Sequence, residues 1–501
     1  MEPIIYNYSI YVNTKECYSI EVMDPYRKLE LKNLEHEAAL SALRFFQAKH
    51  NHRGVAFFRQ CEHEHFIPRL SILGINPSLI FQSKDGETRI EAEGKVESRN
   101  GDPLQIFSEI LSAKKTRARS DLPFFQGGAL GYVGYDAVRF IEPVLMQAKN
   151  LGLKTGKFDA EFIFFKNYLL FDHHGKKVTL LSETVSDEIA IAEALKSLAA
   201  EPSVNQIHHS TRPDVPELPL AAFRSSFSKK AFLAGVDRLK TEIKDGNIFQ
   251  AVLSERFQHD FTGSPIDLFE TLTQINPAPY QFFFSIEERF FLGASPEMLL
   301  KVDGNQVETH PIAGTRARGK TAEEEKKNEQ QLLGCEKEKA EHLMLVDLAR
   351  NDIGRVSTPG SVNVESFQKL RKFGGVMHLV SRVTGKLGPS VSSLDALRSC
   401  FPAGTLTGAP KIRAMSLLAD IEPEARGFYG GAFLAASVSG DLDSCISIRS
   451  LSIEDKIVTI QAGAGIVADS SPENEYLEIE HKTRLSRKAL ASVLAKSRDA
   501  L

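Results

Sequence analysis

Four glutamates in two pairs carry the clearest chemistry in this sequence. Glu338 and Glu341 form one pair, and Glu475 and Glu478 form the other. Each pair has i,i+3 spacing within a segment of helical pattern, so both carboxylates of a pair lie on the same helix face. Two such faces brought together make an all-oxygen site, which suits a hard cation such as Mg²⁺. The pairs therefore indicate a magnesium site built between two helices.

Charged neighbours distinguish these pairs from the solvated surface pairs that isolated glutamates on helices usually form. Lys482 lies one turn beyond Glu478 on the same face, and Asp347, Arg350 and Asn351 follow the first pair. A mixed-sign cluster of this density fits an anionic ligand that is held through a metal.

The two helices that must position the glutamates have recognisable limits. In the first, apolar residues recur from Leu343 to Leu348, and Gly354 supplies a stop. In the second, Ser471 is the expected N-cap and Pro472 takes the first helical position. Further helices are expected over residues 35–48 and 229–244.

Composition narrows the class of protein. A chain of 501 residues that is 42% hydrophobic holds two or three domains, or one large elaborated domain. Its 61 basic and 65 acidic residues nearly balance, which disfavours nucleic acid and membrane surfaces as partners. Five scattered cysteines indicate a reduced, cytoplasmic protein. The N-terminus lacks a signal-peptide pattern, and no apolar run has the length to span a bilayer.

The strands alternate apolar and polar residues, which is typical of antiparallel sheets packed on one side. The expected fold class is therefore α+β with large antiparallel sheets. A segment rich in Pro, Ser and His at 199–226 reads as a connection. It divides the chain into an N-terminal region, 1–215, and a second region, 216–501, and leaves open whether the two form separate bodies.

Two glycine-rich segments are expected to be loops. Residues 461–465 follow a strand but precede another strand-like run, so they do not form a dinucleotide-binding fingerprint. Residues 401–411 precede a helix without the spacing of a P-loop. A structural turn is the commoner explanation for either segment alone, although glycine backbone N–H groups also bind carboxylates.

His378 lies in an alternating strand over 376–381. A lone strand histidine is more often structural than catalytic, and only a position beside a substrate reverses that. No nucleophile elbow and no Cys/His metal pattern is present, so covalent hydrolysis has no support.

Taken together, the motifs of the second region resemble those of the chorismate-utilising enzymes, in particular the group of anthranilate synthase component I. The resemblance covers 225–490 in order, and a weaker match lies at 127–136. The matching stretches are Phe249-Gln250-Ala251-Val252-Leu253-Ser254, Gly293-Ala294-Ser295-Pro296-Glu297, 310–316, 341–352, 404–411, Tyr429-Gly430-Gly431, Ile448-Arg449-Ser450, Gly463-Ala464-Gly465 and Glu475-Tyr476-Leu477-Glu478.

The resemblance implies a fold of antiparallel sheets stacked as a sandwich, with helices on the outside. It also implies Mg²⁺ bound to the ring carboxylate of chorismate. Glu341 and Glu478 match its ligands, and Glu338 and Glu475 match partners that act through water.

The substrate-binding and catalytic groups follow from the same resemblance. Glu297 matches the general acid that protonates the departing C4 hydroxyl, and His378 matches a residue of the second step, pyruvate elimination, as base or as orienter. The substrate-binding positions are Gly314, Thr315, Thr405, Tyr429, Arg449, Gly463, Ala464, Gly465 and Lys482.

Two positions distinguish between the reactions that members of this family catalyse. Enzymes that add water to chorismate use a lysine base where this chain has Gln250, and an amide does not take up a proton. Aminodeoxychorismate synthases typically carry a lysine nucleophile where this chain has Ala313. Amination at C2 by ammonia is therefore expected, as in anthranilate synthase. The alternatives are a 2-amino-2-deoxyisochorismate synthase, an aminodeoxychorismate synthase component I and a non-catalytic chorismate-binding protein.

Family members of this length obtain ammonia from a separate glutamine amidotransferase subunit, so a hetero-oligomer is expected. The chain itself shows no activated cysteine of the kind that such a glutaminase needs.

Feedback-sensitive members bind tryptophan through two segments. The candidate counterparts here are Arg59 and Gln60 in the first segment and Pro279, Tyr280 and Gln281 in the second. Arg59 stands where the family has glutamate, which reverses a charge, and Gln60 is bulkier than the family's serine. Weakened tryptophan inhibition is expected.

Overall fold

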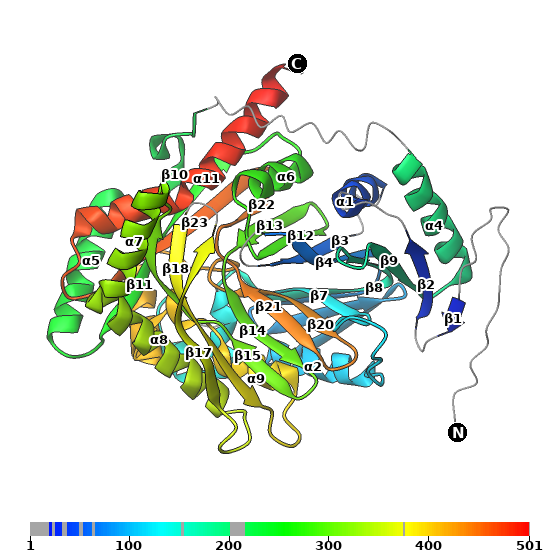
Figure 1. The fold of residues 1–501 in the computed structure, drawn as a ribbon, viewed down its shortest axis with the longest axis horizontal. Helices are drawn as coiled ribbons and strands as arrows, with labels where there is room; N and C mark the ends of the chain where they lie inside the picture. Colours follow the sequence, from blue (N-terminus) through cyan, green and yellow to red (C-terminus); the bar gives the residue numbers. More distant parts are fainter. Residues whose placement is uncertain are drawn as a thin grey trace.

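The computed structural model describes residues 20–22, 26–32, 38–49, 54–62, 66–151, 155–200, 216–373 and 376–499. Within these residues the chain is α+β, with stacked antiparallel sheets covered by helices, as predicted (Figure 1). The helices are α1 (Ala38–Lys49), α2 (Pro103–Ala113), α3 (Val138–Ile141), α4 (Val185–Ala200), α5 (Lys229–Lys244), α6 (Pro265–Ile275), α7 (Ala322–Gly334), α8 (Glu336–Gly354), α9 (Ser393–Cys400), α10 (Lys411–Ile421) and α11 (Pro472–Asp499).

The strands fall into two sequence blocks. The first block is β1 (Ile20–Val22), β2 (Arg27–Lys32), β3 (Val55–Cys61), β4 (Pro68–Lys84), β5 (Glu87–Ala92), β6 (Lys95–Asn100), β7 (Gly128–Val133), β8 (Phe158–Asp172) and β9 (Lys177–Ser182). The second is β10 (Arg224–Ser225), β11 (Gln250–Asp260), β12 (Tyr280–Ile286), β13 (Arg289–Ser295), β14 (Met298–Asp303), β15 (Gln306–Thr309), β16 (Ile312–Ala317), β17 (Asn363–Phe373), β18 (Val376–Lys386), β19 (Gly408–Ala409), β20 (Ala432–Ser437), β21 (Leu442–Ile446), β22 (Ser450–Glu454) and β23 (Ile457–Ile466).

Strands from the two blocks hydrogen-bond directly to each other. Strand β3 pairs with β12, with Phe58 opposite Phe282, and β7 pairs with β20, with Val133 opposite Ala432. These pairings are antiparallel. The predicted boundary at residue 215 ends a segment, 201–215, that lies outside the described residues, so this division stays a prediction.

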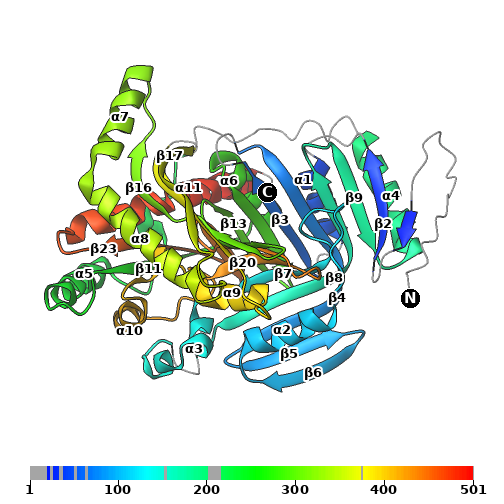
Figure 2. The same ribbon diagram turned by 60° about the horizontal axis from the view of Figure 1, so that its bottom comes forward.

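Most buried apolar side chains pack in three layers, because successive strand residues point to opposite faces. Phe282 and Phe433 belong to the layer between the stacked sheets, where their rings stack at 4.5 Å. A second layer lies under α1, α5, α6 and α11, and a third lies under α2, α9 and α10. Figure 2 shows these helices outside the sheets, and α7 projecting away from the body.

Local sequence signals placed the helices well. Helix α5 has its predicted bounds, and the side chain of Ser228 caps it by accepting from the N–H of Ala231. Helix α11 begins at Pro472, and α8 ends at Gly354, both as predicted. Helix α1 is described from Ala38, since residues 33–37 are outside the described part.

The prediction of a glycine-rich loop over 461–465 is wrong. These residues continue β23 as regular strand, and Gly463 and Gly465 pair with Ser254 and Val252 of β11.

The helices of the described residues include none that is long and apolar enough to cross a bilayer.

Candidate active site

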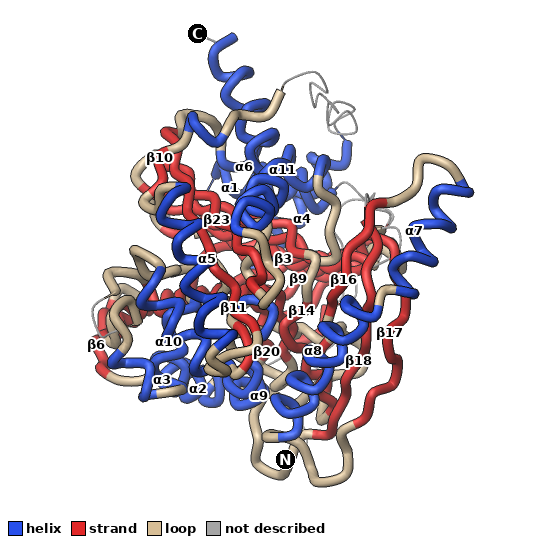
Figure 3. The backbone as a smooth tube through the Cα atoms, turned by 90° about the vertical axis from the view of Figure 1, so that its left-hand side faces the viewer, coloured by secondary structure: helices blue, strands red, loops and turns tan. Residues whose placement is uncertain are grey.

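The four glutamates are carried by helices α8 and α11, which approach each other at their N-terminal ends. Lys337 of α8 forms an ion pair of 2.8 Å with Asp469, just before α11. Helix α8 also packs against strands β16 and β18, which is visible in Figure 3. This packing brings the acidic face of α8 to the strands that carry the other candidate groups.

The carboxylates perturb one another. Burial raises the pKa of Glu341, and the charges of Glu338 and Glu478 raise it further. Burial likewise raises the pKa of Glu475, and Glu478 adds to the effect. The four side chains therefore share one region of excess negative charge, as the sequence predicted.

Two of the four side chains face basic partners. Glu478 lies 2.6 Å from Nζ of Lys482, and Glu338 lies 4.0 Å from Arg316. Among the described residues, no group of three or more His, Cys, Asp or Glu side chains has the geometry of a metal centre. The donor set still fits Mg²⁺, because the carboxylates supply hard oxygen ligands and repel one another without a cation.

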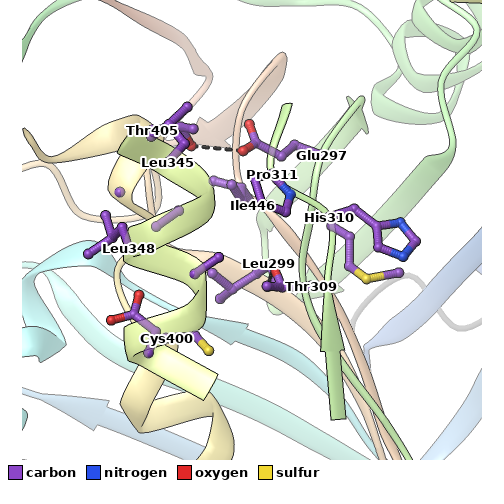
Figure 4. A pocket seen from close by; sticks show the side chains of 15 residues that line it. Glu297, Leu299, Thr309, His310, Pro311, Leu345, Leu348, Cys400, Thr405 and Ile446 are labelled. Atoms are coloured by element: carbon purple, nitrogen blue, oxygen red, sulfur yellow. Dashed lines mark hydrogen bonds between the residues drawn. The ribbon is translucent and has the colours of Figure 1, made fainter. Parts of the chain in front are cut away.

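Glu297 lies in the short turn between β13 and β14. Its carboxylate accepts a hydrogen bond of 2.9 Å from the hydroxyl of Thr405 (Figure 4). Burial raises the pKa of Glu297 to about 7, against the lowering effects of Thr405 and the charge of Lys482. A carboxyl with this pKa is substantially protonated near neutral pH, which is what a general acid requires.

His378 lies on β18 opposite Thr315 of β16. Its Nδ1 lies 2.8 Å from the carbonyl oxygen of Gly314 and 3.2 Å from the hydroxyl of Thr315. A carbonyl oxygen only accepts, so Nδ1 carries the proton and the basic lone pair lies on Nε2. Burial lowers the pKa of His378, and the charge of Arg449 lowers it further, which keeps the ring neutral.

Gly314 connects this histidine to the acidic cluster. Its φ is +69°, and a Cβ atom at this position would lie 3.0 Å from Leu332 and 3.2 Å from Glu338. Only glycine meets both demands, so the β16 backbone passes close to α8 with its carbonyl directed at His378.

A second group of predicted residues gathers around β23. Lys482 donates to the carbonyl oxygen of Gly463 at 2.7 Å, and Arg449 donates to the carbonyl oxygen of Lys482. A Cβ atom on Gly463 would lie 2.9 Å from the hydroxyl of Tyr429. Glycine therefore lets the Tyr429 hydroxyl approach the strand closely.

Strand alternation assigns different roles to the three β23 residues. Gly465 faces Gln250, since a Cβ atom there would lie 3.1 Å from Nε2 of Gln250. The methyl group of Ala464 is instead fully buried in the core under α5 and α11. Only the backbone of Ala464 is therefore available to a ligand.

Gln250 is the first residue of β11 and is buried. Its side-chain oxygen has no hydrogen-bond partner among the described residues. An orphaned buried acceptor is costly unless a ligand satisfies it, so this amide marks a polar position in the site.

Sequence reasoning missed Arg426. Its guanidinium is buried, pairs with Glu422 at 2.6 Å, and lies 4.5 Å and 5.9 Å from the ring centroids of Tyr135 and Tyr429. Arg426 therefore packs its guanidinium against the Tyr429 ring. The i,i+4 spacing of Glu422 and Arg426 was the available signal, but such pairs are usually exposed.

The candidate tryptophan residues lie on the paired strands β3 and β12, with Gln60 opposite Tyr280 and Arg59 opposite Gln281. Gln60, Pro279 and Tyr280 line a cavity of about 690 Å³, at which Gln60 and Tyr280 both donate to Asp443.

Arg59 and Gln281 are not among the residues that line this cavity. Arg59 donates to Ser71 at 2.9 Å and to Gln281 at 3.4 Å, and its guanidinium lies 5.1 Å from the ring centroid of Phe57. Strand alternation explains the difference, because neighbouring residues point to opposite faces.

Comparison with known proteins identifies the family of this chain. A family model described as chorismate binding enzyme matches residues 56–488. Anthranilate synthase component 1 of Geobacillus stearothermophilus is 39% identical over 432 residues, covering 83% of this chain and 84% of the relative. The Bacillus pumilus protein of the same name is 42% identical over 445 residues, covering 84% of each.

Solved structures give the same result. The crystal structure of anthranilate synthase component I from Streptococcus pneumoniae TIGR4 has a TM-score of 0.71 at 36% identity, covering 83% of this chain and 92% of that one. The menaquinone-specific isochorismate synthase of Escherichia coli, at 17% identity and a TM-score of 0.65, shares the fold. The chain belongs to the chorismate-binding enzymes, in the group of anthranilate synthase component 1.

Proposed function

We propose that this chain is the large subunit of an anthranilate synthase, which converts chorismate and ammonia to anthranilate, pyruvate and water. The observation that carries the proposal is the combination of an acid with a raised pKa, Glu297, and a neutral amide, Gln250. Glu297 has a pKa of about 7, and Gln250 offers a hydrogen-bond acceptor where water-adding relatives carry a basic lysine. This site favours loss of the C4 hydroxyl without activating water.

In the first step Glu297 gives its proton to the C4 hydroxyl. The C4–O bond breaks with its electron pair on oxygen and water leaves. Ammonia forms the new C–N bond at C2 as the two ring double bonds shift, and the resulting ammonium group releases one proton. In the second step Nε2 of His378 removes the C2 proton, and the C3–O bond breaks with its electron pair on the enolpyruvyl oxygen. The ring becomes aromatic, and the departing enolpyruvate takes up one proton to become pyruvate. The hydrogen bond to Gly314 fixes the tautomer that this step requires.

Tyr429, Arg449 and the 463–465 backbone hold the enolpyruvyl side, with Arg449 forming a charge-assisted pair with its carboxylate. Lys482 fixes the Gly463 carbonyl oxygen. Glu341 and Glu478 would hold Mg²⁺, with Glu338 and Glu475 orienting its waters. When bound, the ion supplies a positive charge for the ring carboxylate of chorismate and offsets the mutual repulsion of the glutamates.

Incubation of the purified chain with chorismate, Mg²⁺ and ammonium at alkaline pH tests this function. Fluorescent anthranilate is the expected product. Accumulation of a non-fluorescent aminated compound would instead identify a 2-amino-2-deoxyisochorismate synthase. Binding of chorismate without turnover would leave only a chorismate-binding protein.

A separate glutaminase subunit completes the proposed enzyme. Glutaminases attack glutamine with an activated cysteine thiolate. In the described part of the chain Cys61, Cys400 and Cys445 are buried with a raised pKa, and Cys335 is half-buried. The isolated chain is therefore expected to use ammonium and not glutamine, and equal use of both would contradict the proposed partner.

A further inference from the structure

Lys482 of α11 contacts two of the groups that build the candidate active site. Its Nζ lies 2.6 Å from Oε1 of Glu478, one helical turn earlier on α11. The same Nζ donates a hydrogen bond of 2.7 Å to the carbonyl oxygen of Gly463 on β23. The backbone at Lys482 is itself held, because Arg449 donates to its carbonyl oxygen. The ammonium group is therefore fixed between a candidate metal ligand and strand β23.

The charge of Lys482 reaches further carboxylates of the site. Burial raises the pKa of Glu341 and of Glu475, and the charge of Lys482 acts against this rise in both. It opposes the raised pKa of Glu297 in the same way. A Glu–Lys pair with i,i+4 spacing is usually an exposed surface pair of little consequence. This lysine side chain is 34% exposed and acts on several carboxylates of one site, so the pair is not of that kind.

The proposed function gives Glu478 a second cation to hold. Mg²⁺ binds carboxylate oxygens at about 2.0–2.1 Å and demands near-ideal octahedral geometry. Oε1 of Glu478 is already in contact with the Lys482 ammonium. A divalent ion on the same carboxylate would also repel that ammonium, because two positive charges would share one small anionic group. The two cations therefore compete for Glu478.

We propose that Lys482 is the resident counter-ion of the acidic cluster and that its ammonium gives way when Mg²⁺ binds. Without the metal, the ammonium offsets part of the mutual repulsion of the glutamates. With the metal, it leaves Glu478 and pairs with a carboxylate of the bound substrate. The inference rests on the proposed function, because it concerns how this chain admits the ion that the glutamates hold.

The chemistry of lysine and the position of this residue permit the exchange. The ammonium is a compact charge at the end of a flexible four-carbon stem. Gly463, which Lys482 contacts, belongs to the backbone proposed to hold the enolpyruvyl side of the substrate. Arg449, which contacts the backbone of Lys482, is proposed to pair with the enolpyruvyl carboxylate. The ammonium can therefore leave Glu478 and stay within the same site.

The exchange makes the binding of metal and the binding of substrate depend on each other. In the free chain Mg²⁺ must displace the ammonium, which weakens metal binding. A substrate carboxylate that pairs with Lys482 removes this competition and so strengthens metal binding. By linkage, Mg²⁺ must strengthen chorismate binding by the same factor. Lys482 thereby favours assembly of metal and substrate together over binding of the metal alone.

Calorimetric titration of Mg²⁺ into the purified chain tests this competition without measuring activity. Lys482→Met removes the ammonium and keeps a side chain of similar length. Without chorismate, this variant is expected to bind Mg²⁺ at least about tenfold more tightly than the wild type. Lys482→Arg keeps the positive charge, so its Mg²⁺ affinity is expected not to exceed that of the wild type.

Lys337→Met is the matched control for a general change of charge. The charge of Lys337 also acts on Glu341 and Glu475, but its ion pair of 2.8 Å is with Asp469, and its side chain is 60% exposed. A gain in Mg²⁺ affinity of less than about threefold is expected for this variant. Lys482→Gln removes the charge but keeps an N–H donor for a carbonyl oxygen, and it repeats the test if Lys482→Met fails to fold.

The same titrations with saturating chorismate measure the coupling, with ammonium left out to prevent turnover. Chorismate is expected to lower the dissociation constant of Mg²⁺ in the wild type. The factor by which it does so is expected to shrink at least about threefold in Lys482→Met, because the competing ammonium is already absent.

Wild-type or weaker Mg²⁺ affinity in Lys482→Met and Lys482→Gln overturns the inference, and so does an equal gain in Lys337→Met. An unchanged coupling factor in the Lys482 variants refutes the inference alone. Absence of Mg²⁺ binding to the wild type, with and without chorismate, refutes the metal site of the proposed function itself. A wild type that binds Mg²⁺ but makes no anthranilate from ammonium refutes the proposed reaction and leaves the exchange standing.

Discussion

The hydroxyl of Thr405 donates a hydrogen bond of 2.9 Å to Oε1 of Glu297. This bond stabilises the ionised carboxylate, whereas burial stabilises the protonated acid, and the two effects together place the pKa at about 7. The acid function of Glu297 is therefore set by a hydroxyl on a separate loop, which the sequence places 108 residues away.

Thr405→Val removes that hydroxyl at nearly constant volume. The pKa of Glu297 is expected to rise, because a hydrogen bond that favours its ionised form is lost. The alkaline limb of the pH profile of kcat/KM then moves upward by about one unit. Thr407→Val is the matched control, since the Thr407 hydroxyl bonds to backbone carbonyl oxygens and not to Glu297. An alkaline limb unchanged in Thr405→Val would contradict the assignment of that limb to Glu297.

Glu341→Gln and Glu478→Gln each remove one anionic donor from the acidic cluster. Turnover is expected to fall at least about a hundredfold at limiting Mg²⁺, and Glu338→Gln is expected to lose less. The melting temperature supplies a second readout. Without Mg²⁺, Glu341→Gln melts higher than the wild type, because the repulsion from Glu338 and Glu478 is relieved.

Added Mg²⁺ is expected to raise the melting temperature of the wild type and of Glu473→Gln, an exposed control on the first turn of α11. The same rise in Glu478→Gln, together with normal activity, would rule this glutamate out as a ligand.

His378→Asn removes the base but keeps a side chain able to hydrogen-bond to Gly314. Amination is expected to continue while aromatisation stops, so a non-fluorescent aminated product accumulates and anthranilate falls at least about a hundredfold. Quantification of both products by mass spectrometry tests this. Equal loss of both products would place His378 in the first step instead.

Tryptophan is expected to inhibit the wild type weakly or not at all, since the Gln60 amide already bonds to Asp443 at the cavity of about 690 Å³. Gln60→Ser shortens this side chain and leaves Asp443 and Tyr280 for a ligand, so a lower half-inhibition concentration is expected. Arg59→Glu serves as the control, because Arg59 is directed away from this cavity. Half-inhibition of the wild type at low micromolar tryptophan would show an intact site and contradict this expectation.

Features set by short stretches of chain were predictable from sequence. The bounds of α5, the start of α11 and the end of α8 follow from caps, proline and glycine, which act within one helical turn. The pairing of acidic residues on each helix face follows from helical periodicity in the same way. That the two faces meet was inferred through the family resemblance, since no local rule brings α8 to α11.

Features that depend on distant partners were not predictable. Gly463 and Gly465 suggested a loop because glycine weakens strands, yet β11 pairs along their whole length and Tyr429 and Gln250 occupy the space that side chains would fill. The buried position of Arg426 and the hydrogen bond from Lys482 to Gly463 arise from several elements at once. Neither leaves a pattern in any single segment.

The pairing of β7 with β20 has a consequence for how the molecule is made. The partner of strand Gly128–Val133 is Ala432–Ser437, which the ribosome synthesises about 300 residues later. At ordinary elongation rates this delay is roughly 15 to 60 s, during which the edge of β7 that pairs with β20 stays unpaired on the ribosome. Loops this long also slow closure of the sheet. Yield in the cell should therefore depend on chaperone capacity during synthesis more than on the stability of the finished fold.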